Sequence, residues 1–251
     1  MWSTIILISW IPGFRGRYRG IITVSTRTER RRTDQLVGND VASERIMCAN
    51  YIVDSVLYWA GEYHIDGFRF DLMGLLDTGL MNRIEMELSS RYGKGEKLVF
   101  GEPWSASETP MEQEALPALK KNIDRLNPQV GFFCDDTRDA IKGHTFEGGT
   151  PGFVNGGKGQ EGAILSSVKA WCGPGSKVQA PSQVVTYVSA HDNWTLWDKL
   201  SLTVEDEAER MRANRMAAAV YMTCQGRIFF LFRGRSVPHK RRTRKFLQRS
   251  D

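Results

Sequence analysis

The sequence predicts an α/β fold built on a parallel sheet, and three observations support this prediction. Short apolar runs typical of buried strands alternate with segments whose apolar residues recur at helical spacing. Several of these runs end in polar residues, so chemically active side chains gather at the carboxyl ends of the strands. The chain has 251 residues, 41% of them hydrophobic and 10% aromatic, which is enough for one large α/β domain or two small ones.

The first half of the chain contains a strand–helix–strand unit, the building block of a parallel sheet. A helix is expected to begin with Ser43 as its N-cap, because Ile46, Ala49 and Val53 follow at helical spacing, and to end near Gly61. We then expect a strand over 67–71, a helix over 81–91 and a strand over 98–101 that is stopped by Pro103.

The same alternation continues to residue 231. The glycine-rich segment 145–162 is expected to be a surface loop, because its GGKG lacks the spacing and the strand–helix setting of a phosphate-binding loop. The other predicted elements are a short helix after Pro103, a strand over 131–136 that runs out into acids, a helix over 163–171, a strand over 183–193 that ends in His191 and Asp192, a helix over 205–224 and a strand over 228–231.

The stretch HIDGFRFDLMG, residues 64–74, places charged residues in what otherwise resembles a buried strand. Successive side chains of a strand point to opposite faces, so Arg69 and Asp71 share one face while Phe68 and Phe70 share the other. A charged pair on a buried face costs free energy unless it is matched or used. From these residues alone, a structural ion pair and a functional pair are both open.

Three acids, Asp71, Glu102 and Asp192, each stand at the carboxyl end of a predicted strand, which is the edge that supplies catalytic groups in a β/α barrel. The strands of Asp71 and Glu102 follow one another in the chain and are expected to be neighbours about 4.8 Å apart. Two carboxyl groups about 5 Å apart suit a retaining glycosidase, in which one is the nucleophile and the other the acid and then the base. Arg69 would hold Asp71 ionised and aimed, and Glu102 would be the general acid.

Residues beside these acids are candidates for sugar contacts. His191 is expected to donate a hydrogen bond to a sugar, and Asp192 to bind ring hydroxyls as positive charge develops. Trp104, Trp194 and Trp197 offer aromatic faces on which sugars stack, although a tryptophan in a barrel more often belongs to the core. A purely structural role for His191 is also open.

The motifs DGFRFDLMG, GEPWSA and YVSAHDNWTLWDKL resemble the second, third and fourth signature regions of the α-amylase superfamily of glycoside hydrolases. Together with GNDVASER near Gly38 and FFCDDTRDAIKG near Phe132, they are similar to those of type I pullulanases, which cut α-1,6 linkages in pullulan and limit dextrins. The resemblance runs from about Gly38 to Leu231. It implies a partial (β/α)8 TIM barrel that covers roughly the third helix to the eighth strand.

The resemblance also implies a role for each candidate residue. The parent enzyme would be a retaining debranching hydrolase with an α-glucan substrate, no cofactor and no metal, and this chain alone would be inactive. By position in the motifs, Asp71 matches the nucleophile, Glu102 the acid/base, Asp192 the transition-state aspartate, Arg69 and His191 their supporting partners, and Trp104 and Asn193 substrate-side positions. The family's first signature region, of the form DVVYNH, and the upstream motif YNWGYDP are absent from the chain.

The two ends of the chain differ in charge from its middle. Residues 1–37 contain seven Arg and two acids, and residues 227–251 contain nine Lys or Arg and one acid, whereas acids exceed bases between them. Synonymous codons can be chosen so that a shifted frame over residues 1–8 gives VVYNHTY and a shifted frame over 232–251 gives SGEEVFRTKEGQENSYNAP, which resemble sequences expected at these places in pullulanases. We therefore interpret 38–231 as the partial catalytic barrel, and 1–37 and 232–251 as out-of-frame segments.

Other functions stay open at this stage. An isoamylase or glycogen-debranching specificity is the nearest alternative within the superfamily. A metal-dependent barrel enzyme would use Asp71, Glu102, His191 and Asp192 as ligands. A fragment that binds nucleic acid through its basic ends is the non-enzyme alternative, but the acidic middle argues against a nucleic-acid partner despite the net charge of +5.

The sequence gives weaker indications of location. No apolar run approaches the roughly 20 residues of a membrane span, and Met1–Trp10 has no positive region ahead of its apolar residues. The four cysteines, Cys48, Cys134, Cys172 and Cys224, form no CxxC or metal-binding spacing and are expected to stay reduced. We therefore favour a bacterial cytoplasmic location over a secreted one, with the oligomeric state open.

The interpretation of the ends predicts a specific DNA sequence. Sequencing the locus and its flanks should reveal frames encoding VYNH and GEE that overlap the two ends, each joined to the middle by an insertion or deletion not divisible by three. If the codons used at 1–8 and 232–251 leave the shifted frames unrelated to pullulanases, the basic ends are genuine protein, and the nucleic-acid and solvated-tail interpretations regain priority.

Overall fold

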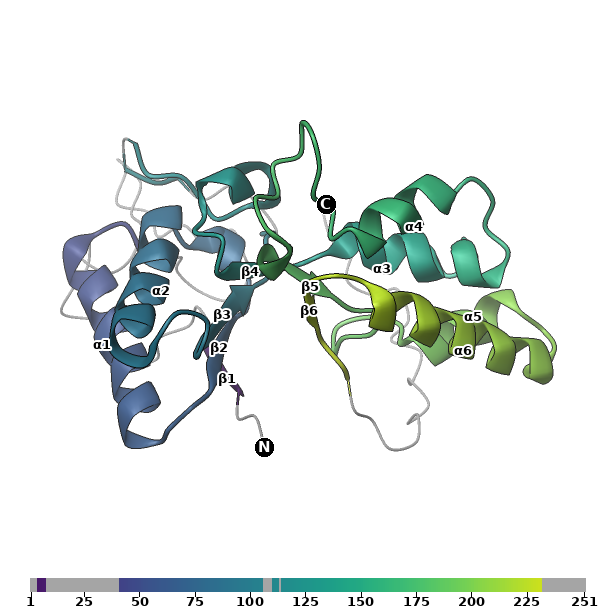
Figure 1. Cartoon of the computed structure of the whole chain (residues 1–251), viewed down its shortest axis with the longest axis horizontal. Coiled ribbons are helices and arrows are strands. Elements are labelled where there is room, and N and C mark those ends of the chain that lie inside the picture. Colours follow the sequence, from purple (N-terminus) through teal and green to yellow (C-terminus); the bar gives the residue numbers. More distant parts are fainter. Residues whose placement is uncertain (1–3, 8–40, 106–109, 113, 232–251) are drawn as a thin grey trace, which may run out of the picture.

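The computed structural model describes residues 4–7, 41–105, 110–112 and 114–231, and it confirms the predicted α/β fold. Six parallel strands form one sheet whose spatial order, β1-β2-β3-β4-β5-β6, is also their order along the chain. Helices α1 and α2 lie at one end of the molecule and α3, α4, α5 and α6 are grouped at the other, with the strands between them (Figure 1). Within the described residues the sheet is open, with β1 and β6 at its edges, as in a partial (β/α)8 barrel.

The elements alternate as the sequence predicts. The strands are β1 (Thr4–Leu7), β2 (Gly67–Phe70), β3 (Leu98–Gly101), β4 (Val130–Phe133), β5 (Val184–Thr186) and β6 (Arg227–Ile228). The α-helices are α1 (Ile46–Glu62), α2 (Thr78–Tyr92), α3 (Asp135–Lys142), α4 (Glu161–Val168), α5 (Leu196–Thr203) and α6 (Glu207–Thr223). Short 3-10 helices are η1 (Met73–Leu75), η2 (Lys120–Arg125), η3 (Phe153–Asn155) and η4 (Pro181–Gln183).

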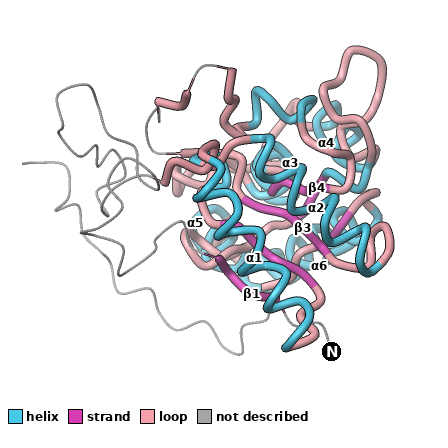
Figure 2. The backbone as a smooth tube through the Cα atoms, turned by 90° about the vertical axis from the view of Figure 1, so that its left-hand side faces the viewer, coloured by secondary structure: helices cyan, strands magenta, loops and turns pink. Residues whose placement is uncertain are grey.

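The two faces of the sheet are packed differently. Phe68 and Phe70 of β2 belong to the largest core cluster, in which the strands pack against the apolar faces of α1 and α2. Figure 2 shows α1 lying across the strands. The opposite face carries a smaller, aromatic cluster around Phe100, Phe133 and Tyr187, in which the ring centroids of Phe133 and Tyr187 are 5.0 Å apart. Arg69 therefore faces the aromatic side of the sheet while its neighbours Phe68 and Phe70 face the helices, as the alternation predicts.

A second packing unit lies beyond the sheet. Its buried residues come from α3, η3, α5 and α6, and from Val188 just after β5. The burial of Leu200 and Ala217 joins α5 to α6 in this unit. The described part of the chain thus consists of a sheet with two helices and a group of helices that follows β4 and β5.

The structure corrects several boundaries. Ser43 is not an N-cap: Arg45 holds that position in α1 without a side-chain hydrogen bond, and the Ser43 hydroxyl instead donates to Asp77 Oδ2 over 2.8 Å. The acidic end of the predicted strand 131–136 is helical, because Asp135 and Asp136 form the first turn of α3, where they are favourable for the helix dipole. The strand predicted over 183–193 shortens to β5, and the strand predicted over 228–231 is replaced by β6, which begins one residue earlier and ends at Ile228.

Among the strands and α-helices, two elements were not predicted. β1, with the sequence TIIL, is rich in β-branched residues, lies within 1–37 and pairs in parallel with β2. The rest of 1–37 and all of 232–251 lie outside the described residues. Helix α5 was missed although its capping box is visible in the sequence: Thr195 Oγ1 accepts a hydrogen bond from the Asp198 amide over 3.2 Å, and Asp198 Oδ2 accepts one from the Thr195 amide, also over 3.2 Å.

Two further observations bear on the predictions about location. Cys48, Cys134, Cys172 and Cys224 are all free thiols. Among the described residues, no helix combines the length and the hydropathy that crossing a membrane requires.

The Ser43–Asp77 contact predicts an unequal cost of removing two helix caps. Asp77 accepts from the Leu80 amide over 2.9 Å and is bonded to the buried Ser43, whereas the exposed Asp206 caps α6 by accepting from the Glu209 amide over 2.8 Å. Losing a cap costs about 1 kcal/mol, and leaving the buried Ser43 O–H without its acceptor adds about 1–3 kcal/mol, while the Ser43 oxygen still accepts from the amide of residue 77. Asp77→Ala should therefore speed amide exchange at Leu80 by more than 30-fold, or about 2 kcal/mol. Asp206→Ala should speed it at Glu209 only about 5-fold, and equal effects would contradict the role of Ser43.

Candidate active site

The site begins where β2 and β3 end side by side. Arg69 belongs to β2 and stands opposite Phe100 of β3 in the sheet register. Asp71 and Glu102 are the first residues after these two strands. The guanidinium of Arg69 makes ion pairs with both carboxylates, through Nη1 to Asp71 Oδ1 and through Nη2 to Glu102 Oε1. The structure therefore brings together the two acids and the cation that the sequence selected.

The burial of these side chains determines how strongly the arrangement depends on its ion pairs. The side chains of Arg69 and Glu102 are only 5% and 6% exposed, whereas that of Asp71 is 22% exposed. The Arg69 guanidinium also lies 5.3 Å from the ring centroid of Phe133. A buried guanidinium is stable only when its donors are matched, and here two carboxylates match them. The two ion pairs that stabilise the buried guanidinium therefore also hold both acids at one edge of the sheet.

The turn after β2 holds Glu102 by its backbone. The Leu72 amide donates to Glu102 Oε2 over 2.8 Å, and the Gly74 amide donates to the Glu102 carbonyl over 3.0 Å. Leu72 makes this contact from the left-handed region, at φ 46° and ψ 46°, which is uncommon for a residue with a side chain. The turn can sit this close because Gly101 has no Cβ: one there would lie 2.7 Å from Met73 Cβ in the turn and 2.7 Å from the Phe70 carbonyl oxygen at the end of β2.

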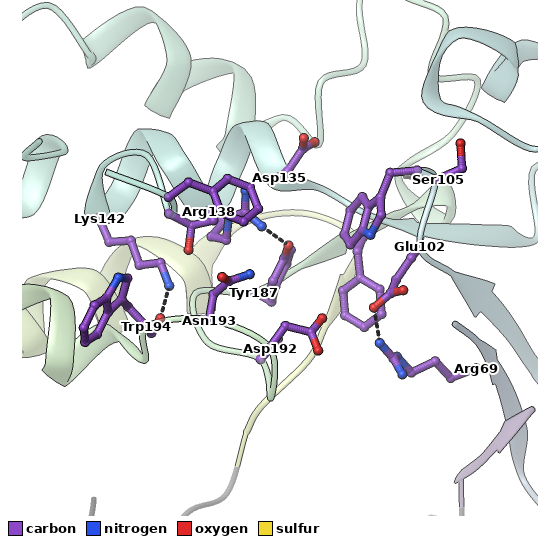
Figure 3. Close-up of a pocket in the computed structure, with 15 residues that line it drawn as sticks. Arg69, Glu102, Ser105, Asp135, Arg138, Lys142, Tyr187, Asp192, Asn193 and Trp194 are labelled. Carbon is purple, nitrogen blue, oxygen red and sulfur yellow. Dashed lines mark hydrogen bonds and ion pairs between the residues drawn. The ribbon is translucent and has the colours of Figure 1, made fainter. Parts of the chain in front are cut away.

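A cavity of about 380 Å³ opens beside this edge. Figure 3 shows Arg69 and Glu102 on one side of it and Asp192, Asn193 and Trp194 from the loop after β5 on another, with the Asp192 carboxylate turned toward Glu102. The lining residues are Arg69, Glu102, Trp104, Ser105, Phe133, Asp135, Arg138, Lys142, Thr145, Phe146, Tyr187, Ala190, Asp192, Asn193 and Trp194.

Most of the predicted site residues meet at this cavity. Of the seven, Arg69, Glu102, Trp104, Asp192 and Asn193 line it. Asp71 and His191 are not among the residues that line the cavity. Asp71 contacts the lining residue Arg69. His191 contacts the lining residue Asp192, with 3.1 Å between His191 Nε2 and Asp192 Oδ1. The side chains of His191 and Asp192 are 58% and 48% exposed, so this corner of the site is open to solvent.

Sequence reasoning missed one wall of the cavity, which α3 provides. Arg138 and Lys142 lie one turn apart on this helix. Arg138 Nη1 donates to the Tyr187 hydroxyl over 2.8 Å, and Lys142 Nζ donates to the Trp194 carbonyl over 2.6 Å (Figure 3). A spacing of four residues indicates that Arg138 and Lys142 share one face of a helix, but the strand predicted over 131–136 overlaps the start of α3 and obscures this pattern.

Burial changes the ionisation of two groups in this wall. It raises the pKa of Tyr187 well above the usual range, so the hydroxyl stays neutral. It also lowers the pKa of Lys142 to about 7, with a further contribution from the positive charge of Arg138. A lysine that can lose its proton near neutral pH therefore lines the cavity.

The metal-dependent alternative finds no support in the donor set. Among residues 4–7, 41–105, 110–112 and 114–231, no three His, Cys, Asp or Glu side chains are grouped as metal ligands. The place between Asp71 and Glu102, where an ion would have to sit, holds the guanidinium of Arg69.

Comparison with known proteins gives consistent results. No family model matches the chain. The chain is 40% identical over 195 residues to the pullulanase of Bacillus subtilis strain 168, an alignment that covers 76% of this chain and 26% of that relative. It is 28% identical over 182 residues to isoamylase 3 of rice, covering 67% of this chain and 20% of the relative. The chain thus spans about a quarter of the length of the pullulanase.

Solved structures agree with these relatives. The crystal structure of type I pullulanase from Bacillus subtilis, complexed with maltose, superposes with a TM-score of 0.80 at 30% identity, covering 91% of this chain and 33% of that one. The pullulanase of Paenibacillus barengoltzii, complexed with maltohexaose and α-cyclodextrin, gives a TM-score of 0.82 at 33% identity over 91% and 37% of the two chains.

The setting of Lys142 predicts an unusual titration. In the chain with ¹³C at lysine Cε, the Lys142 resonance, assigned by its loss in Lys142→Arg, should titrate near pH 7. Since the lowered pKa belongs to the folded state only, the unfolded chain binds more protons between pH 7 and the ordinary lysine pKa of about 10.4, and stability rises with pH there by about 1.4 kcal/mol per unit. A Lys142 midpoint above about 9 would contradict the assigned burial.

Proposed function

Because the chain belongs to the pullulanase family, we propose that residues 38–231 form the catalytic part of a retaining debranching enzyme. Its reaction is the hydrolysis of α-1,6-glucosidic linkages in pullulan and in starch- or glycogen-derived dextrins. The observation that supports this proposal best is the pair of ion pairs from Arg69 to Asp71 and Glu102 at the ends of neighbouring strands. Glu102 lines the cavity and Asp71 adjoins it through Arg69, and a pair of neighbouring carboxyl groups is what glycoside hydrolysis with retention requires.

The first chemical step needs both acids. Glu102 gives its proton to the oxygen of the scissile linkage, while an oxygen of Asp71 attacks the anomeric carbon, so that the old carbon–oxygen bond breaks and a glycosyl–Asp71 ester forms. In the second step Glu102, now ionised, takes a proton from water, and the water oxygen displaces Asp71 from the sugar. Two inversions at one carbon retain the α configuration.

Arg69 has a part in both steps. It contacts Asp71, which must be ionised to attack, and Glu102, which becomes ionised when it has given up its proton. A fixed cation between the two groups can stabilise whichever of them carries the charge, without reorganising. Its burial keeps this interaction poorly screened by water.

The opposite side of the cavity is the proposed sugar site. Asp192 and Asn193 would bind ring hydroxyls, with His191 supporting Asp192, and Trp104 would offer an aromatic face. Similar pullulanases have been solved in complex with maltose and with maltohexaose and α-cyclodextrin, which supports a glucan ligand. No nucleic-acid partner is proposed. We place the protein in the cytoplasm, in keeping with its four free cysteines, and we retain 1–37 and 232–251 as out-of-frame segments.

Removing either carboxylate should nearly abolish turnover. The test uses a hybrid enzyme in which residues 41–231 replace the matching segment of the Bacillus subtilis pullulanase, so that the remaining barrel strands are present. Pullulan hydrolysis, followed by reducing ends, should fall by about 10³-fold or more in Asp71→Asn and in Glu102→Gln. Glu205→Gln, at an exposed position, is the matched control and should leave it unchanged. The 251-residue chain alone is expected to be inactive, and full activity in either variant would refute the role of that residue.

The stereochemistry of the product tests the mechanism separately. In the hybrid, proton NMR of the newly released reducing end should show the α-anomer first, with the β-anomer appearing later by mutarotation. A product released first as the β-anomer would indicate a single displacement and would rule out Asp71 as a nucleophile.

A further inference from the structure

Two buried lysines cross between the end of α3 and the beginning of α5. Lys142 is the last residue of α3 and Lys199 lies near the start of α5. Their residues are 1% and 0% exposed. Burying a lysine amino group costs free energy in either protonation state unless its N–H groups are bonded, so two of them within one packing unit need a compensating set of contacts.

Each lysine donates to the backbone beside the other helix. Lys142 Nζ donates to the carbonyl of Trp194, the residue before the N-cap of α5, over 2.6 Å. Lys199 Nζ donates to the carbonyl of His144, just after α3, over 2.9 Å, and also to the carbonyl of Glu147. The contacts are reciprocal, and we call Lys142 and Lys199 with these carbonyls the lysine brace.

The lysine brace joins two loops that form one wall of the cavity. Thr145 and Phe146 lie in the loop held by Lys199, and Asp192, Asn193 and Trp194 lie in the loop held by Lys142. The second loop is also tied at its base, where the Leu196 amide donates to Ser189 Oγ over 2.8 Å.

The position of the half-exposed Asp192 depends on the support that the lysine brace gives to its loop. It contacts His191, which is more exposed still, so this pair provides little rigidity of its own. Where its carboxylate lies therefore depends on the backbone between Ser189 and Trp194. An apolar side chain at position 142 would fill the same space at a lower desolvation cost, but it would leave the Trp194 carbonyl without this donor.

We propose that Lys142 is a positioning residue of the active site, which fixes Asp192 by holding the Trp194 carbonyl, and that Lys199 completes the support from the other helix. This inference rests on the proposed hydrolysis for its effect on catalysis but not for its effect on the loop. Arg138 and Asp139 on α3, and Asp198 and Lys199 on α5, are the charged groups around Lys142.

The loop effect can be measured in the full chain without any substrate. With 5-fluorotryptophan at the seven Trp positions, the ¹⁹F signal of Trp194, assigned by Trp194→Phe, should broaden or shift in Lys142→Met. The signal of Trp171, whose Nε1 donates to Thr137 over 2.8 Å, should not move and so reports that the fold is intact. Lys142→Arg keeps a donor and should restore the Trp194 signal, and exposed Lys158→Met is the matched control.

Two results of this experiment would overturn the proposal. One is a Trp194 signal that is unchanged in Lys142→Met. The other is a signal displaced as far in Lys142→Arg as in Lys142→Met, because the loss would then follow packing and not the donor. If Lys142→Met also disturbs Trp171, the comparison of Lys142→Arg with the unmodified chain decides in the same way.

The catalytic effect is read in the hybrid enzyme. Lys142→Met should lower kcat by about 10- to 100-fold with a change in KM of less than about 3-fold, because Asp192 is needed most in the transition state. Lys142→Arg should recover most of the loss. An unchanged kcat would overturn the catalytic part of the inference, whereas a hybrid that is inactive without any substitution would refute the proposed function and leave the ¹⁹F result to decide the loop contact.

Discussion

The site depends on one interaction, the buried guanidinium of Arg69 between two carboxylates. Without Asp71 and Glu102, the charge of Arg69 would be buried against the ring of Phe133 without these two partners, and without Arg69 the two acids would lose the cation that lies between them. The three residues are therefore mutually required. The ion pairs also join the ends of β2 and β3, and the turn at Leu72 and Gly74 follows from the need to reach Glu102. The ion pairs that join the ends of β2 and β3 therefore also hold the two candidate catalytic acids in place.

The cavity lies where two packing units meet. One consists of the sheet with α1 and α2, and it supplies Arg69 and Glu102; the other consists of the helices after β4, and it supplies the wall with Lys142. Strands β4 and β5 connect them, because β4 leads directly into α3 and β5 leads into the loop before α5. A rotation between the units would change the separation of Glu102 and Asp192, because these two residues lie on different sides of the cavity (Figure 3). Contacts that cross from helix to loop, such as that of Arg138 with Tyr187, limit such a rotation.

The elements that were predicted well are those in which the spacing of apolar residues along the element itself shows which face is buried. β3 was predicted to the residue, and α1 and α2 to within a few residues, since their apolar periodicity reflects burial on a single face. The failures occurred where a distant partner decides. Ser43 has the chemistry of a cap, but Asp77, 34 residues away, takes its hydroxyl. In the sequence, Lys142 resembles an ordinary solvent-exposed lysine at the end of a helix. In the structure it is buried and donates to the Trp194 carbonyl just before α5, and no local sequence pattern indicates this burial. The strand-end acids could be predicted because their position along the chain already specifies the edge, whereas the α3 wall depends on how whole helices pack.

The left-handed turn at Leu72 has a consequence for how such a chain evolves. A side chain in that conformation raises the free energy of the folded state by about 1 kcal/mol relative to glycine, which adopts it without strain. Glycine would also give the turn more freedom, and the Leu72 amide would then point at Glu102 for less of the time. Selection for thermal stability and selection for turnover therefore act in opposite directions at this position. A population screened only for heat resistance should drift toward glycine or asparagine at residue 72, and one screened for catalysis should keep a bulkier residue.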